Sequence, residues 1–245
     1  MTSENDIAQR FARETTNHEM TVLHDDGLYR HIRFQKPQNG CGWFELITVP
    51  GVLIFRGDGE GFTFARLTDM FEFFRGRPGH INASYWAEKV TDGRERLQRY
   101  DEEIFKSYVT DYIADAKDSL PGLEDAVREQ ILESEEIGYD DEGWARRLVD
   151  DFSFYLNEND RYDYRKTPDF QFHDTWEWDL KDYHWWYLWA CHAIVWGIRF
   201  YDTGKRPEMP VPATPTAPAE TATPETIDGR PVVDVQLPEP VGSES

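Results

Sequence analysis

The segment DYHWWYLWACHAIVWGIRFYD, residues 182–202, most restricts what this chain of 245 residues can fold into. Its uncharged run from Tyr183 to Ile198 has sixteen residues, which would rise about 24 Å as a helix. A membrane span needs about 20 apolar residues to cross roughly 30 Å of hydrocarbon, and Trp and Tyr favour the membrane interface over its centre. We therefore predict a buried helix over residues 181–202, apolar on all sides, rather than a membrane span or an interfacial anchor.

Two stretches of alternating hydrophobicity predict the first hairpin of an antiparallel sheet within residues 18–67. EMTVLHD and LYRHIRF flank Asp26-Gly27, a dipeptide that is favoured in two-residue hairpin turns. Paired residue numbers then sum to 53, which sets His24 opposite Tyr29. The other face of this hairpin would carry Leu23, Leu28, Ile32 and Phe34.

A second hairpin is predicted from GWFELITV and VLIFRG, which are joined by Pro50-Gly51. Pairing across that loop sets Glu45 against Arg56, a charge match that supports the register. The glycines of GDGEG lead into GFTFARL, a predicted fifth strand, and Thr68 is expected to cap a short helix over DMFEFFR. Because the glycine-rich run lies between two strands, it predicts a turn and not a dinucleotide site, which needs a helix after the loop.

Helical periodicity replaces alternation over residues 101–157 and predicts three amphipathic helices. The third apolar stripe consists of Trp144, Leu148, Phe152 and Tyr155. Residues 101–160 contain 19 acidic and 5 basic residues, most of the excess in a chain with a net charge of -21. The outward helix faces are therefore acidic, through residues that include Asp111, Asp115, Asp118, Glu133, Glu135 and Glu136. This charge favours a basic protein partner or mere solubility, and it disfavours direct contact with nucleic acid or anionic membranes.

The last 43 residues, 203–245, hold nine of the fourteen prolines and predict a disordered tail rich in Pro, Thr and Glu. Within the tail, PVVDVQLP has strand character that could extend the edge of a partner's sheet. Residues 1–202 are then a single α+β domain: a mostly antiparallel sheet of about five strands packed with helices, with the aromatic helix buried at its centre. Two cysteines and no apolar signal segment predict a cytoplasmic protein.

Polar side chains of the first predicted hairpin form a candidate ligand-binding face, which consists of His24, Tyr29, His31 and Arg33. Imidazole and guanidinium groups suit an anionic small molecule, although an ordinary solvated sheet face has the same composition. A metal site that adds Asp25 and Asp26 is disfavoured, because Asp25 points to the opposite face and Asp26 belongs to the turn.

A second set of potentially reactive side chains, His184, Cys191 and His192, lies in the aromatic segment. His184 is two helical turns from the other two, and adjacent helical residues diverge by about 100°, so shared metal ligation or a Cys–His nucleophile is disfavoured. Cys191 is expected to be a small buried hydrophobe. The sequence has no P-loop, GxSxG or HExxH motif, and we predict no catalytic residue, no metal site and no cofactor.

Several longer motifs resemble a family of uncharacterised proteins from actinobacteria and their bacteriophages. They are HDDGLYRHIRF, WFELITVPG, the run from GDGEGFTF to DMFEFFR, INASYWAEK and WGIRFYD. The resemblance covers roughly residues 20–90 and 180–202 and implies an intracellular accessory protein associated with a phage or mobile element. It implies no catalytic residue.

The sequence therefore predicts a non-enzymatic accessory protein that presents its acidic helices to a basic protein partner. Two alternatives belong to other classes. One is an enzyme or small-ligand binder that uses the His/Tyr/Arg sheet face, and the other is a structural component of a virion or nucleoprotein assembly.

Overall fold

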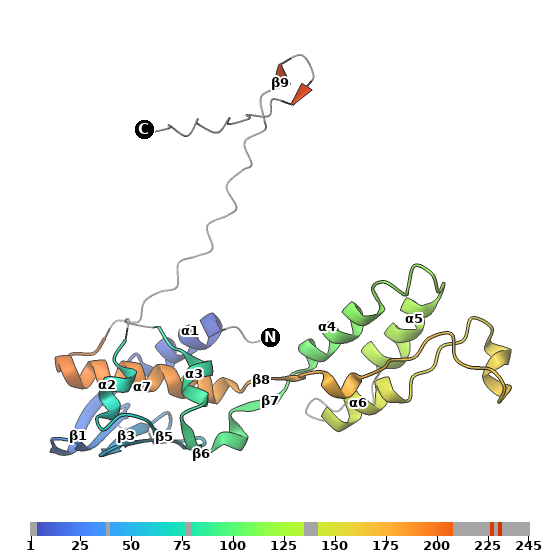
Figure 1. Ribbon diagram of the computed structural model, residues 1–245. Helices are drawn as coiled ribbons and strands as arrows, with labels where there is room; N and C mark the ends of the chain where they lie inside the picture. The colour runs from blue at the N-terminus through green and yellow to red at the C-terminus, as the bar shows by residue number, and fades with distance from the viewer. Residues whose placement is uncertain are drawn as a thin grey trace, which may run out of the picture. The chain divides into compact units, whose positions relative to one another are not determined.

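The computed structural model describes residues 4–37, 40–76, 80–134 and 142–207, together with two strands of two residues each further along the chain (Figure 1). Those strands, β9 (Thr226–Ile227) and β10 (Arg230–Pro231), pair in antiparallel orientation. Met1–Pro210 form one compact unit. Within its described residues, no helix combines the length and apolarity that a bilayer crossing requires.

A six-stranded sheet forms the base of this unit. It consists of β1 (Glu19–Asp26), β2 (Tyr29–Gln35), β3 (Phe44–Val49), β4 (Val52–Gly57), β5 (Phe62–Ala65) and β6 (Val90–Asp92). The strands lie in sequence order, and each is antiparallel to its neighbour. The predicted α+β class and antiparallel sheet are confirmed. The sixth strand escaped prediction because it has only three residues and no clear alternation.

The two hairpins differ in how well the sequence predicted their register. In the second hairpin Glu45 pairs with Arg56 across the two-residue loop Pro50-Gly51, as predicted. The predicted register of the first hairpin is wrong, because Asp26 pairs with Tyr29 and the loop is Gly27-Leu28. Gly27, with a φ of +61°, takes the first loop position instead of the second.

A β-bulge in β1 partly offsets this shift in register. The pairing is irregular between Val22 and His24, so Leu23 is the extra residue. Ile32 and Phe34 face the core as predicted, whereas Leu23 is exposed. His24 lies opposite His31, not opposite Tyr29.

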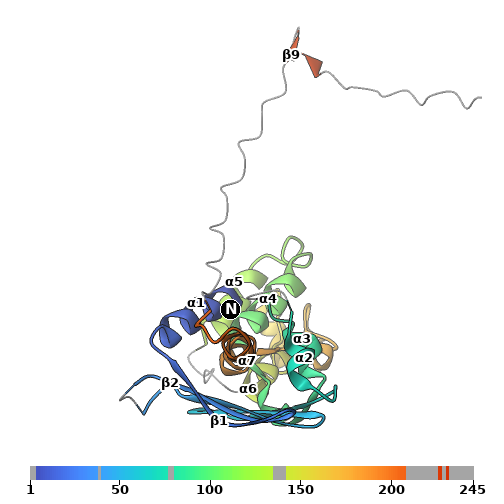
Figure 2. The ribbon, with the colours of Figure 1, turned by 90° about the vertical axis from the view of Figure 1, so that its left-hand side faces the viewer.

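Four helices cover one face of the sheet, and the other face is open (Figure 2). They are α1 (Glu4–Thr15), α2 (Met70–Phe74), α3 (Ala83–Ala87) and α7 (Trp185–Thr203). Most of α7 is buried, which confirms the predicted aromatic helix. The helix begins at Trp185 and not at residue 181, because residues 181–183 pair as a strand. Gly197 allows α7 to approach the sheet, because a Cβ atom there would lie 2.9 Å from Leu46 Cδ1.

A second hydrophobic core lies in the segment between β7 (Gln98–Tyr100) and β8 (Lys181–Tyr183). This segment, residues 101–180, is called the helical lobe, and residues 4–97 with 184–207 are called the sheet lobe. The helical lobe contains the helices α4 (Glu102–Ile113), α5 (Leu123–Val127) and α6 (Glu142–Asp150), and the π-helical turn η2 (Arg128–Leu132) follows α5 directly. Two 3-10 turns, η3 (Glu158–Tyr162) and η4 (Thr175–Glu177), lie between α6 and β8. Another 3-10 turn, η1 (Arg94–Arg96), precedes β7.

The helical lobe does not use α7 as its apolar partner, contrary to expectation. Its core is closed by its own aromatic residues, among them Phe172 and Trp178. Trp178 belongs to this core and not to the core that contains α7, and Trp176 is 73% exposed. Of the predicted third stripe, Phe152 is buried and Leu148 packs against this core, whereas Trp144 is exposed. On α6, Ala145 and Val149 supply the fully buried positions.

β7 and β8 form an antiparallel ribbon through which the chain enters and leaves the helical lobe (Figure 1). Backbone hydrogen bonds close both ends of the ribbon. Asp101 N donates to Leu180 O at 2.9 Å, and His184 N donates to Leu97 O at 2.8 Å. The helical lobe is therefore an insertion whose two ends lie side by side.

The ordered chain continues past the predicted boundary at residue 202. Arg206 Nη2 donates to His18 O at 2.6 Å, and Trp196 Nε1 donates to Pro207 O at 3.2 Å. Of the predicted tail, residues 208–225, 228–229 and 232–245 lie outside the described residues, and this includes most of PVVDVQLP.

These contacts predict that the choice of truncation site affects stability. Truncation after Asp202 should lower Tm by about 4 °C relative to truncation after Pro207, the shift expected for a loss of 1 to 2 kcal/mol in a chain of this size. Thermal unfolding of the two truncated proteins checks this. Equal Tm values would show that the contacts of Arg206 and Pro207 add nothing to stability.

Candidate functional sites

The four polar residues predicted to share a sheet face lie on the open face. Along β2 the core-facing residues Arg30, Ile32 and Phe34 are buried, so Tyr29, His31 and Arg33 point to the other side. His24 is the cross-strand partner of His31 and lies on the same face. Asp25 points toward α7, as expected, and its carboxylate accepts a hydrogen bond from Tyr201 Oη at 2.9 Å.

A buried carboxylate at the centre of this face was missed in the sequence. The side chain of Glu45 on β3 is only 5% exposed. His31 Nε2 lies 3.0 Å from its Oε2, and Arg33 Nη1 lies 3.5 Å from its Oε1. From β4, Arg56 Nε lies 3.4 Å from Oε2. The Glu45–Arg56 pair was predictable from the second hairpin, whereas Arg33 joins it only through the pairing of β2 with β3.

Trp43 completes this group, which is called the Glu45 cluster: Glu45, His31, Arg33, Arg56 and Trp43. The guanidinium carbons of Arg33 and Arg56 lie 4.8 and 5.3 Å from the centre of the Trp43 ring. Cation–π attraction of this kind holds arginines against an aromatic ring. Two guanidinium groups surround one carboxylate, so the cluster is positively charged in a chain of net charge -21.

Hydrogen bonding in the Glu45 cluster is incomplete. Glu45 Oε2, His31 Nε2 and Arg33 Nε are buried atoms without a hydrogen-bond partner among the described residues. The 3.0 Å distance between His31 and Glu45 places the two groups in contact, but their orientation does not form a directed hydrogen bond. Buried polar atoms are costly to leave unpaired, so such a cluster calls for an explanation.

The predicted acidic residues that the structure describes lie on the surface of the helical lobe. Asp111 is in the last turn of α4, Asp115 and Asp118 follow that helix, and Glu133 follows η2, all of them exposed. Glu135 and Glu136 lie outside the described residues. The described acidic residues therefore lie in two segments of the helical lobe and face solvent, as predicted from the sequence.

A groove of about 270 Å³ in the helical lobe had no signal in the sequence. It lies between α5 with η2 on one side and residues 153–162 on the other. Its lining includes Gln130, Phe154, Tyr155, Glu158, Arg161 and Tyr162. Tyr162 is 88% exposed and Tyr164, close by in sequence, is 94% exposed. Side chains of this size and exposure contribute little to the fold and are common at protein interfaces.

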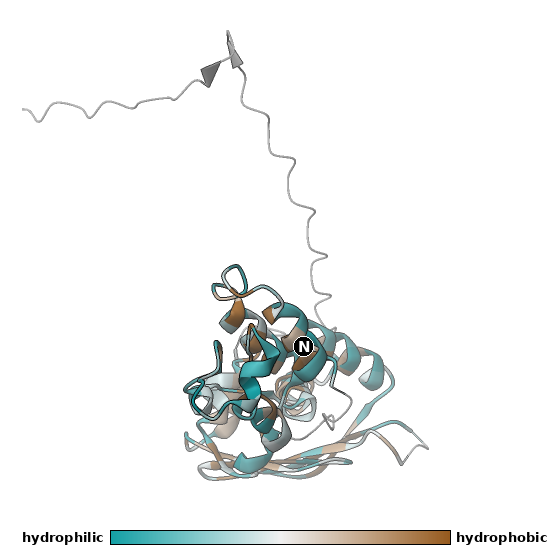
Figure 3. Ribbon diagram, turned by 90° about the vertical axis from the view of Figure 1, so that its right-hand side faces the viewer, coloured by the Kyte–Doolittle hydropathy of each residue, from teal (hydrophilic) through white to brown (hydrophobic). Residues whose placement is uncertain are grey.

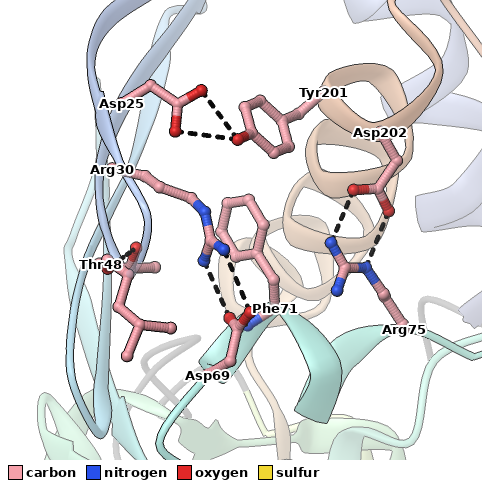
Figure 4. A network of polar contacts seen from close by, with 9 residues as sticks. Asp25, Arg30, Thr48, Asp69, Phe71, Arg75, Tyr201 and Asp202 are labelled. Carbon is pink, nitrogen blue, oxygen red and sulfur yellow. Dashed lines mark hydrogen bonds and ion pairs between the residues drawn. The ribbon is translucent and has the colours of Figure 1, made fainter.

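A polar network joins β1 and β2, α2 and the end of α7 on the covered side of the sheet (Figure 4). The guanidinium of Arg30 donates to both carboxylate oxygens of Asp69, at 2.9 and 3.1 Å. Hydrogen bonding from Arg30 lowers the pKa of Asp69 below its usual value. Asp69 also caps α2 by accepting from Phe71 N, so the predicted cap at Thr68 is wrong by one residue.

Paired charges occupy the rest of this network. Arg75 donates to both carboxylate oxygens of Asp202, at 2.9 and 2.7 Å. Arg30 also lies over the Phe71 ring at 4.6 Å. Because its main charges are matched by bidentate pairs, the network is suited to holding α2 and α7 against the sheet.

Cys191 and His192 on α7 are buried. Burial raises the pKa of the Cys191 thiol, which disfavours the nucleophilic thiolate. Burial lowers the pKa of His192 to about 4, so this imidazole is neutral at pH 7. Among the described residues, no group of three or more His, Cys, Asp and Glu side chains is placed to hold a metal ion.

Hydrophilic and hydrophobic residues alternate along the helices and the strands (Figure 3). Comparison with family models, curated proteins and solved structures found no match.

Proposed function

We propose that this protein is a non-enzymatic accessory protein that acts by protein–protein contact, with the helical lobe as the contact surface and a basic protein as the partner. The observation that carries the proposal is the exposure of Asp111, Asp115, Asp118 and Glu133 on a lobe that has its own hydrophobic core. These charges do not contribute to that core.

Electrostatic complementarity gives such a surface its effect on binding. An acidic patch attracts a basic partner, accelerates encounter and disfavours acidic competitors. The exposed Tyr162, Tyr164 and Trp176 belong to the same lobe, and Tyr and Trp are frequent among residues that dominate binding energy. Exposed acidic and aromatic side chains on the same lobe support contact with a protein in preference to solubility alone.

Charge reversal tests the proposal. The triple variant Asp111→Lys, Asp115→Lys, Asp118→Lys should weaken binding to the partner captured from the host at least tenfold, while Tm stays nearly unchanged because exposed charges contribute little to stability. Affinity is measured by titration calorimetry with the purified partner. Wild-type affinity should also fall as salt rises.

A matched control changes the same number of charges on the sheet lobe. Glu72→Lys, Glu88→Lys, Glu95→Lys reverses three exposed acidic residues there and should leave affinity unchanged. Equal weakening by both triple variants would show that affinity depends on net charge and not on the helical lobe. The proposal is rejected if neither the helical-lobe variant nor added salt changes the affinity.

The expected setting is the cytoplasm, supported by the small number of cysteines. Association with a phage or mobile element is supported by the sequence resemblance alone.

A further inference from the structure

We infer that the open face of the sheet is a second docking surface, which binds an acidic segment of a protein through Arg33 and Arg56. This surface is separate from the acidic residues of the helical lobe and does not depend on their function. Figure 2 shows that the helices of the sheet lobe lie on the opposite face.

The residue types on this face are those of a binding surface. Beside the Glu45 cluster, the cross-strand neighbours Ile47 and Ile54 are partly exposed, and Val49 and Tyr29 are exposed. Trp, Tyr and Arg are the residue types most frequent among those that dominate protein–protein binding, and the aliphatic side chains add apolar area beside them. An occupant that lies along the sheet can contact both the aliphatic and the charged residues.

The charge of the Glu45 cluster identifies the occupant as acidic. Each guanidinium has five N–H donors, and Glu45 lies near only one nitrogen of Arg33 and one of Arg56. The side chains of Arg33 and Arg56 are 37% and 56% exposed, so a carboxylate of a partner can reach guanidinium donors that Glu45 does not use. Glu45 orients the two arginines and leaves the cluster with net positive charge.

Buried unpaired atoms provide an independent observation. Glu45 is more than nine-tenths buried, and its Oε2 lacks a hydrogen-bond partner, as do His31 Nε2 and Arg33 Nε. A carboxylate of a partner can accept from Arg33, so that binding reduces the number of unpaired donors while Arg33 and Arg56 stay beside Glu45. A nucleic acid is a poor occupant, since a chain of net charge -21 repels a long polyanion much more than a short acidic segment.

The test uses the full-length protein labelled with ¹⁵N and, as probe, a synthetic octapeptide of alternating Glu and Val. The peptide should shift the indole N–H resonance of Trp43 and amide resonances of β2 to β4 in a saturable manner. Inorganic phosphate, titrated separately, should bind at least tenfold more weakly, because it cannot contact Ile47 and Ile54. If phosphate binds as tightly as the peptide, the face is a general anion site and the proposed recognition of a protein segment is wrong. The absence of any shift with the peptide would also overturn the proposal.

Two variants separate binding from folding. Arg33→Gln, Glu45→Gln, Arg56→Gln removes the positive charge without leaving Glu45 buried and unpaired, and it should weaken peptide binding at least tenfold. Glu45→Gln alone removes the competing carboxylate and should strengthen binding several-fold, which a purely structural role of Glu45 would not do. Tm is measured for each variant.

The control is Arg147→Gln, because Arg147 also stacks on a tryptophan, Trp144, at 5.3 Å but belongs to the helical lobe. It should bind the peptide like the wild type. A triple variant that folds and retains wild-type affinity, or a Glu45→Gln variant that binds more weakly, would overturn the proposal.

Discussion

Replacement of Trp189 by alanine is expected to lower the free energy of unfolding by about 3 to 5 kcal/mol, the range for removal of a large buried aromatic side chain. Trp189 is 1% exposed and lies at the centre of the sheet-lobe core. Its ring stacks on Trp186 with centroids 4.8 Å apart and meets the edge of Phe11 at 5.0 Å. Its indole N–H also donates to Glu14 Oε2 at 2.8 Å, a bond that alanine cannot make.

Chemical denaturation measures this loss, and Trp176→Ala is its control. Trp176 is 73% exposed, so its removal should change the free energy of unfolding by less than about 0.5 kcal/mol. Similar losses in the two variants would contradict the assignment of α7 as the centre of the core.

Acid should begin to destabilise the protein near pH 6.5, before most carboxylates titrate, because of His192. Burial lowers the pKa of this histidine from 6.5 to about 4. Between these values the unfolded chain binds a proton that the folded chain does not, so stability is complete above pH 6.5 and falls as pH drops toward 4. The loss should reach about 3 kcal/mol, at 1.36 kcal/mol per pKa unit.

Unfolding free energies at pH 7 and pH 4.5 test this effect in the wild type and in His192→Phe. The phenylalanine has no titrating group, so this variant should lose much less stability on acidification. Burial also lowers the pKa of His18, which leaves part of the acid sensitivity in place. His173→Phe, at an exposed position, should behave like the wild type. Equal acid losses in all three proteins would exclude His192 as the cause.

The registers of the two hairpins show where local sequence is sufficient to predict the sheet. Around Pro50-Gly51, alternation and the Glu45–Arg56 pair agree on one register, and that register is the one observed. Around Gly27, the dipeptide Asp-Gly allows two positions for the loop. The observed choice places Arg30 beside Asp69, a contact between residues 39 positions apart that no local pattern contains.

The helical lobe shows a second limit of local patterns. Apolar periodicity located its helices but not their partner, because an apolar stripe does not specify what covers it. Phe170 and Phe172, in a segment without regular periodicity, supply much of that cover. The candidate sheet face shows the same limit. Alternation alone placed His24, Tyr29, His31 and Arg33 on one face, whereas the presence of Glu45 and Arg56 beside them follows from the order of the strands.

The ribbon of β7 and β8 has a consequence for how this chain can vary. Because Asp101 and Leu180 are joined by a backbone hydrogen bond, the 80 residues from 101 to 180 begin and end at one point on the sheet lobe. Segments attached in this way can be lengthened, shortened or exchanged without changing the order of the strands, as tolerated domain insertions show. The sheet lobe can thus keep its strand order while the helical lobe varies in length and sequence.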